Sequence, residues 1–157
     1  VRRGWPDRLL LRIEEQEEVA AWEEDALLNS DGDLFYPKQP EQFTADLIRL
    51  HGPRGTEKRV LQTWLSVRSY FQLLSLKVNR LTLNSRRAWL VELENGLRLN
   101  LGREETTGRV DRFARVYRKF VAPIVPRVAA LDLRYTNGYA VSWREGQRPE
   151  LKPAVVR

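Results

Sequence analysis

The chain has 157 residues, of which 42% are hydrophobic, 10% aromatic and 31% charged. This balance holds too much apolar surface for a disordered tail and too much charge for a bundle of membrane-spanning helices, so it predicts one globular domain. Lys and Arg outnumber Asp and Glu by 27 to 21, and the net charge of +6 favours anionic surroundings without identifying a partner. The lack of cysteine excludes a disulfide framework, a thiolate nucleophile and a thiolate metal site.

The sequence has no apolar run of the roughly 18 residues that are needed to cross a bilayer. It begins at Val1, close to a strand pattern, and we expect it to be an internal piece of a longer polypeptide. Any signal or membrane anchor is then expected outside this piece.

Strand patterns come first along the chain. Residues 8–14 alternate between apolar and charged side chains, as in a half-buried strand, and residues 19–22 form a second short apolar run. The pair Asp31-Gly32 separates two further apolar runs, at 26–28 and 34–36, and predicts a hairpin. Residues 46–50 fit either a helical turn or a short strand.

Two amphipathic helices are predicted. The first starts at Thr56, a plausible N-cap, and carries its apolar face at helical spacing on Val60, Trp64, Val67, Phe71 and Leu74. The second covers residues 107–121, with Pro123 and Pro126 ending it. Its apolar face is Val110, Phe113, Tyr117 and Phe120, and Arg112, Arg115 and Lys119 point away from that face.

The remaining segments predict strands. Leu81 and Leu83 indicate one strand, and residues 88–101 predict a hairpin around Asn95-Gly96, a pair that readily takes the two positive φ angles of a type I′ turn. A further strand is expected over 128–135, then a turn at 136–138 and a last strand over 139–143. Residues 146–157 read as a flexible tail.

This order of elements predicts an α+β fold, an antiparallel-rich mixed sheet with both amphipathic helices packed on one face. The last strand has nothing after it in the chain to pair with its outer side, and no proline protects it before Pro149. Residues 139–143 are therefore a candidate open edge, where a partner strand would gain main-chain hydrogen bonds. Tyr139, Val141 and Trp143 also have a core interpretation, because at period 2 they share one face of the strand.

Catalytic patterns are weak. The one histidine, His51, lies in a loop of Gly and Pro with no nucleophile or acid at motif spacing. A basic nucleic-acid-binding module stays open as the alternative function, because Arg86 and Arg87 lie beside Trp89 and further basic residues follow on the second helix at Arg109, Arg112, Arg115, Arg118 and Lys119. Against it, Asp111 is spaced to pair with Arg115, and arginines opposite an apolar helix face usually serve solvation.

Several motifs together resemble the FtsQ/DivIB family of bacterial cell-division proteins. In the first half they are Trp5-Pro6-Asp7-Arg8-Leu9, Val19-Ala20-Ala21-Trp22 and Gly52-Pro53-Arg54-Gly55-Thr56-Glu57. In the second half they are Arg86-Arg87-Ala88-Trp89, Leu99-Asn100-Leu101-Gly102-Arg103 and the run Leu131-Asp132-Leu133-Arg134-Tyr135-Thr136-Asn137-Gly138-Tyr139-Ala140-Val141-Ser142-Trp143. The resemblance extends in order over nearly all of residues 1–145.

The resemblance implies a domain organisation and a cellular location. Residues 1–22 would be the end of a POTRA module and residues 23–145 the β domain, followed by the tail at 146–157. The chain would be the periplasmic part of a single-pass inner-membrane protein at the division septum, and it would meet the membrane only through an N-terminal anchor outside this piece.

The resemblance also implies a non-enzymatic scaffold without cofactor or metal. Its partners would be FtsB and FtsL, with other divisome proteins as further candidates and without nucleic acid, and a segment of FtsB would add as a strand beside the last strand. By position, the partner surface would comprise Arg87, Arg134, Tyr135, Asn137, Gly138, Tyr139, Val141 and Trp143.

Overall fold

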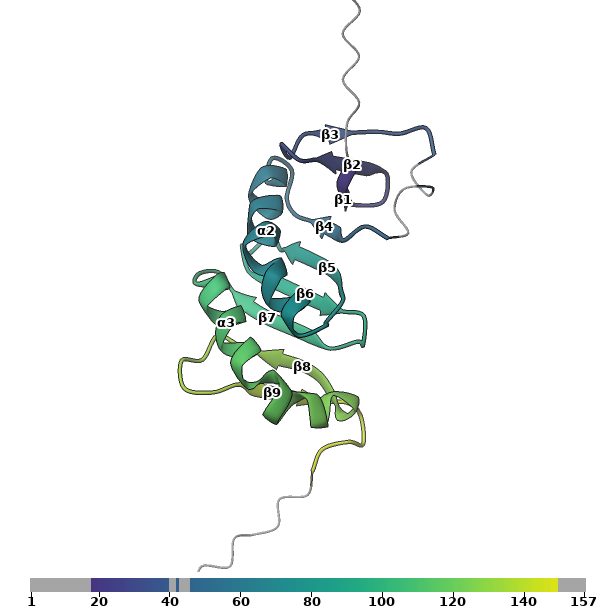
Figure 1. Ribbon diagram of the computed structural model, residues 1–157. Coiled ribbons are helices and arrows are strands. Elements are labelled where there is room, and N and C mark those ends of the chain that lie inside the picture. Colours follow the sequence, from purple (N-terminus) through teal and green to yellow (C-terminus); the bar gives the residue numbers. More distant parts are fainter. Residues whose placement is uncertain (1–17, 40–41, 43–45, 150–157) are drawn as a thin grey trace, which may run out of the picture.

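The computed structural model describes residues 18–39, 42 and 46–149 (Figure 1). The strand expected over 8–14 lies outside these residues, as does most of the expected tail. Within them the chain forms one nine-stranded sheet in the order β3-β2-β1-β4-β5-β6-β7-β8-β9. The strands are β1 (Glu18–Trp22), β2 (Ala26–Asn29), β3 (Leu34–Phe35), β4 (Arg49–His51), β5 (Val78–Leu83), β6 (Trp89–Leu93), β7 (Arg98–Gly102), β8 (Val128–Asp132) and β9 (Ala140–Trp143).

The sheet is mixed, as predicted. Neighbouring strands are antiparallel except for three parallel pairs, β1–β4, β4–β5 and β7–β8. The segment at 46–50, open between helix and strand in the sequence, contributes to β4. Parallel neighbours need a crossover connection, and helices supply two of them. The helix α2 (Glu57–Leu73) joins β4 to β5, and α3 (Thr106–Val116) begins the connection from β7 to β8.

Both helices cover the same face of the sheet (Figure 1). That face is built from alternate strand residues, so Leu81, Leu83, Val91, Leu99 and Leu131 are fully buried beneath the helices. The two helices meet through aromatic rings, with the centroids of Phe71 and Phe113 6.4 Å apart. The predicted α+β architecture is therefore confirmed.

The end of the second helix differs from the prediction. The α-helix stops at Val116, and the chain continues as a π-helical turn, η1 (Tyr117–Val121), and a 3-10 turn, η2 (Ala122–Arg127). Pro123 has no N–H to donate to the carbonyl four residues earlier, and its ring collides with that carbonyl, so regular helix cannot continue. The wider turn shifts the register of the apolar face. Phe120, expected in the core, is 59% exposed, and Val121 is buried in its place.

The turn at Asn95-Gly96 also differs from the predicted type I′. Gly96 has a φ of +83°, but Asn95 is not among the residues with positive φ. The Gly96 N–H donates to the Leu93 carbonyl at 2.9 Å, and the Leu93 N–H donates to the Leu97 carbonyl at the same distance. These bonds define a three-residue loop, a type I turn followed by a left-handed residue. The strands of the predicted hairpin are confirmed, and only the turn geometry was wrong.

The same loop occurs in two other hairpins. Gly32 takes the left-handed position between β2 and β3, with a φ of +77°. Between β5 and β6 that position is held by Arg87, with a φ of +61°. A residue with a Cβ is disfavoured there by about 1–2 kcal/mol, so Arg87 is a strained residue at a hairpin tip.

No helix in the described part of the chain is both long and apolar enough for a membrane span.

Candidate functional site

The last strand, β9, forms one end of the sheet (Figure 1). It pairs antiparallel with β8, from Val128 opposite Trp143 to Asp132 opposite Ala140. Within the described residues no strand pairs with its other side. The N–H and C=O groups on that outer side are thus left for another chain or for water. We call residues 135–143, which comprise β9 and the loop before it, the β9 edge.

The side chains of β9 alternate as the sequence predicts. Val141 and Trp143 are half-buried against the core, and Tyr139 just before the strand packs in the same way. Ala140 and Ser142 are exposed. The core interpretation of the three larger residues is therefore right, yet the backbone edge beside them is still unpaired by the described chain. The exposed parts of Tyr139, Val141 and Trp143 form an apolar strip on the face of β9 that the helices cover in the rest of the sheet.

The loop before β9 adds a shallow hollow. Tyr135 is 55% exposed, and with residues 136–140 it lines a pocket of about 490 Å³. A second pocket of about 310 Å³ lies between this loop and α3, where Arg112 and Val116 form its other wall. Burial raises the pKa of the Tyr139 hydroxyl, and the nearby charge of Arg112 opposes that rise. The β9 edge thus offers backbone groups and aromatic rings, with the Arg112 cation of α3 beside it.

An arginine-rich pocket of about 580 Å³ lies at the same end of the strands. Arg86, Arg103, Arg109 and Arg134 line it, with Glu104 as its one acidic lining residue. Gly102 lets two of them converge, because a Cβ at this position would lie 2.4 Å from Arg109 Nη1 and 2.9 Å from Arg134 Cγ. Arg134 also donates from Nε to Asp132 Oδ1 at 2.9 Å. That hydrogen bond holds the pKa of Asp132 below its usual value.

Comparison with known proteins assigns the family of this chain. A family model for the C-terminal part of the cell division protein FtsQ/DivIB matches residues 20–150. The chain belongs to the FtsQ/DivIB family of cell division proteins. It is 36% identical to the cell division protein FtsQ of Vibrio cholerae over 143 residues, which cover 91% of this chain and 54% of that protein.

Other FtsQ proteins match to a similar extent. The protein of Shewanella oneidensis is 37% identical over 151 residues, covering 96% of this chain and 56% of the relative. The protein of Methylomonas methanica is 33% identical over 144 residues, covering 92% of this chain and 57% of the relative. The chain thus spans about half the length of the relatives that it matches, and the family resemblance seen in the sequence is confirmed.

Most of the residues that the FtsQ/DivIB resemblance suggested lie at one end of the strands, whereas Val141 and Trp143 continue along β9, with Trp143 opposite Val128 at the start of β8. Because β8 and β9 are antiparallel, the end of β8 at Asp132, with Arg134 just beyond it, lies beside the start of β9. Arg87 lies at the tip of the hairpin between β5 and β6, where β6 begins and β7 ends. From β6 to β9 there are three strand spacings, about 14 Å in all. The structure therefore places Arg87 at the same end of the sheet but apart from the β9 edge.

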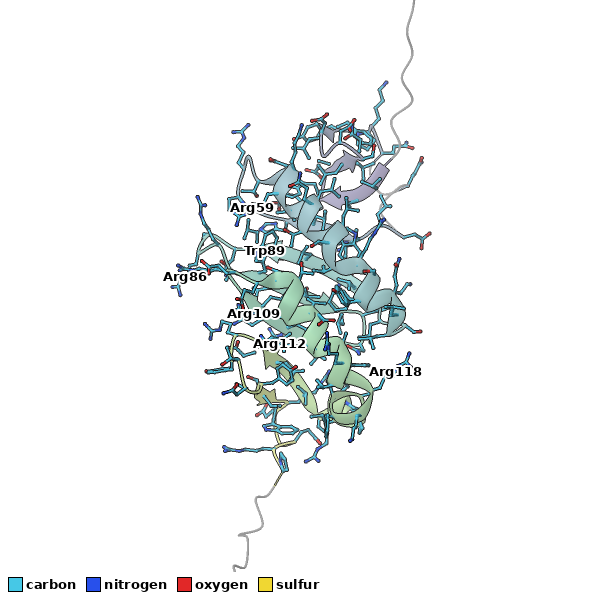
Figure 2. All side chains as sticks on the ribbon, turned by 60° about the vertical axis from the view of Figure 1, so that its left-hand side comes forward. Arg59, Arg86, Trp89, Arg109, Arg112 and Arg118 are labelled. Carbon is cyan, nitrogen blue, oxygen red and sulfur yellow. The ribbon has the colours of Figure 1, made fainter. Side chains whose placement is uncertain are left out.

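The arginines of the predicted second helix are engaged within the fold. Arg112 donates to the Thr136 carbonyl at 3.1 Å, and Arg118 donates to the Leu73 carbonyl at 3.0 Å. Arg115 pairs with Asp111 at 2.8 Å, as the spacing predicted, and Arg109 donates to the Leu101 carbonyl. Figure 2 shows Arg109 and Arg112 toward one side of the molecule and Arg118 on the other. These contacts do not favour a single basic stripe for nucleic acid.

His51, the weak catalytic candidate, lies at the end of β4. Its Nδ1 is 2.7 Å from Glu23 Oε2, and both side chains are exposed, at 48% and 42%. The described residues contain no group of three or more His, Cys, Asp and Glu side chains arranged to hold a metal ion.

Two features of the site were missed by sequence reasoning. The first is the convergence of Arg109 and Arg134 over Gly102, for which a glycine at the end of a strand was the only signal. The second is the hydrogen bond from Arg112 to the loop before β9. It joins residues far apart in the sequence and leaves no local pattern.

Proposed function

We propose that this chain acts as a periplasmic, non-enzymatic scaffold domain at the division septum, and that it recruits FtsB and FtsL. In this proposal a segment of FtsB adds as a strand to the outer side of β9. The single observation that carries the proposal is that β9 ends the sheet, with no strand of the described chain on its other side. An antiparallel or parallel strand at that position would extend the sheet by main-chain hydrogen bonding.

Backbone pairing alone is too weak to hold the partner. A four-residue strand such as β9 offers about four outward hydrogen-bonding groups, because groups on alternate sides bond to different neighbours. At about 0.5–1.5 kcal/mol each, these contribute roughly 2–6 kcal/mol, less than the 8.2 kcal/mol of a micromolar complex. Side chains must supply the rest. Tyr135, Tyr139, Val141 and Trp143 are the apolar groups in place to do so, with Asn137 and Gly138 in the loop between them.

The proposed surface extends beyond one strand. Arg87 is about 14 Å from β9 by strand spacing, too far for the side chains of an added strand that follows β9. We therefore propose that the partner has a second segment, which crosses the end of the strands and meets Arg134 and Arg87. Acidic side chains would suit this segment, because opposite charges at a rim speed association and select the partner.

The organisation of the chain is part of the same proposal. Residues 1–22 are assigned to the end of a POTRA module, residues 23–145 to the β domain and residues 146–157 to a tail. Because β1 ends at Trp22 and pairs with both β2 and β4, a continuous sheet would connect the two units. The inner-membrane anchor is assigned to the remainder of the protein.

The test is binding of the periplasmic segment of FtsB to purified protein before and after Tyr135→Ala and Trp143→Ala. Each variant is expected to lose at least about tenfold in affinity, because aromatic anchors dominate such interfaces. Tyr36→Ala is the matched control, since Tyr36 is an aromatic residue that is 71% exposed beside β3 at the opposite end of the sheet. If both folded variants bind FtsB as tightly as the unmodified protein, the site is wrong.

Salt dependence separates the scaffold from the nucleic-acid alternative. Phosphate binding weakens steeply and linearly with the logarithm of salt concentration, whereas strand addition with apolar anchors is less sensitive. Binding of single-stranded DNA or RNA with such a steep slope, and no binding of FtsB, would favour the alternative.

A further inference from the structure

The loop that leads into β9 has little backbone support of its own. Beyond β8, the Leu133 N–H donates to the Asn100 carbonyl at 2.9 Å, and the Arg134 N–H donates to Asp132 Oδ1 at 3.1 Å. In the described chain, the hydrogen bond that reaches residues 135–139 from outside the β8–β9 ribbon comes from Arg112 Nη1 to the Thr136 carbonyl. A short strand at the edge of a sheet opens readily unless its ends are held, so this contact bears on the whole β9 edge.

The far end of β9 is held by different arginines. Arg144 donates from Nε to the Val128 carbonyl at 3.2 Å, and Arg127 donates from Nη2 to the Gln147 carbonyl at 2.9 Å. Arg127 also lies over the ring of Trp143, 5.6 Å from its centroid. These contacts hold the exit of the strand, whereas the entry depends on Arg112. Loss of the Arg112 contact would therefore release one end of β9 and leave the other in place.

The helix gives Arg112 a rigid base. Its neighbours on α3, Val110 and Phe113, are fully buried in the core. Arg112 itself is half-buried and lines the pocket between α3 and the loop. In Figure 2 it lies on the part of α3 that is nearest to the C-terminal ribbon. A guanidinium on such a base can fix the position of a carbonyl in the facing loop.

We infer that Arg112 is a positioning residue for the β9 edge: it holds the Thr136 carbonyl, and thereby sets the loop from which β9 begins. The inference rests on the proposed strand addition and extends it. A partner strand that meets a preformed edge does not have to order that edge, so less of the interaction free energy is lost on binding. Arg112 would act through the loop, without touching the partner strand.

The first experiment uses the protein without any partner. Hydrogen exchange of single amides is measured by NMR in the unmodified protein, in Arg112→Gln and in Arg118→Gln. Arg118→Gln is the matched control, because it removes the same charge and a similar arginine-to-carbonyl bond at a distant place, the end of α2. We expect the amides of β9 that bond to β8 to exchange about three- to tenfold faster in Arg112→Gln only, the factor that follows from losing one hydrogen bond of ordinary strength. Unchanged exchange there would overturn the inference.

The second experiment measures binding of the FtsB segment. Arg112→Gln is expected to weaken it about three- to tenfold while the melting temperature of the protein stays close to that of Arg118→Gln. Faster exchange with unchanged affinity would show that the loop does not prepare the edge, and the inference would be wrong. If the unmodified protein does not bind FtsB, the proposed function fails, but the exchange result still decides whether Arg112 holds the loop.

Two further variants complete the test. Gly138→Ala in the Arg112→Gln background is expected to slow the exchange again, because a Cβ at this position has open space around it and restricts the loop. Arg112→Met, which keeps the aliphatic packing, replaces Arg112→Gln if the latter does not fold. If neither variant folds, Arg112 belongs to the folding core, and its assignment as a positioning residue is wrong.

Discussion

Replacing Arg87 with glycine is expected to make the protein more stable and, at the same time, a weaker partner for FtsB. The hairpin at 84–88 has the same hydrogen bonds as the hairpin at 29–33. In one, Asn84 Oδ1 accepts from the N–H groups of Arg86 and Ala88 at 3.0 and 2.9 Å, and in the other, Asn29 Oδ1 accepts from two N–H groups at the same distances. The left-handed position is glycine in the hairpin at 29–33 and arginine in the hairpin at 84–88.

The magnitude follows from two opposing contributions. Relief of the left-handed conformation stabilises the variant by about 1–2 kcal/mol. The greater backbone entropy that glycine loses on folding offsets about 0.5–1 kcal/mol. The net gain is then about 0.5–1 kcal/mol in the free energy of unfolding, which for a chain of 157 residues corresponds to a rise in Tm of about 1.5–3 °C.

Thermal and urea unfolding measure the gain, with Arg86→Gly as the control. Arg86 is the adjacent residue with the same charge, but it is not among the residues with positive φ, so glycine there should lower stability by about 0.5–1 kcal/mol. A loss of stability in Arg87→Gly similar to that in Arg86→Gly would refute the reasoning about the turn.

Binding of the FtsB segment measures the other half of the prediction. An exposed charge at a rim is worth about 0–1 kcal/mol, so we expect Arg87→Gly to weaken binding about two- to fivefold, mainly through slower association. A more stable variant with unchanged affinity would remove Arg87 from the proposed partner surface and leave its strained backbone without a functional explanation.

Gly102→Ala should destabilise by about 1–2 kcal/mol in urea unfolding, because the φ of Gly102 is +72° and a residue with a Cβ is strained there. Gly108→Ala, in open space on α3, should instead stabilise by about 0.4–1 kcal/mol. Phe113→Ala should cost about 3–5 kcal/mol, since the ring is fully buried. The pKa of Asp132 is lowered in the folded state by its hydrogen bond from Arg134. The contribution of Asp132 to the free energy of unfolding is therefore present above about pH 4 and is lost as the pH falls through the folded pKa. Asp132→Asn should accordingly flatten the acid side of a profile of Tm against pH.

Local patterns determined most of the elements. The spacing of Val60, Val67 and Phe71 predicted α2, and strand alternation predicted β6, β7 and β9, because the side chains of one element repeat at a fixed period whatever surrounds it. The same reasoning failed at Phe120 and at Asn95. At Phe120, a proline further along the chain shifted the helix register. At Asn95, the two paired strands are joined by a three-residue loop in place of the predicted two-residue turn.

The sequence by itself determined the fold class, the family and the position of the last strand as a candidate edge. Only the tertiary structure decided that no strand of the described chain covers that edge, that Arg87 and Arg134 lie at the same end of the sheet, and that Arg112 reaches Thr136. The physical reason is that periodicity reports which side of its own element a residue occupies. Which elements become neighbours depends on the parallel crossovers through α2 and α3, and these bring together residues with no pattern in common.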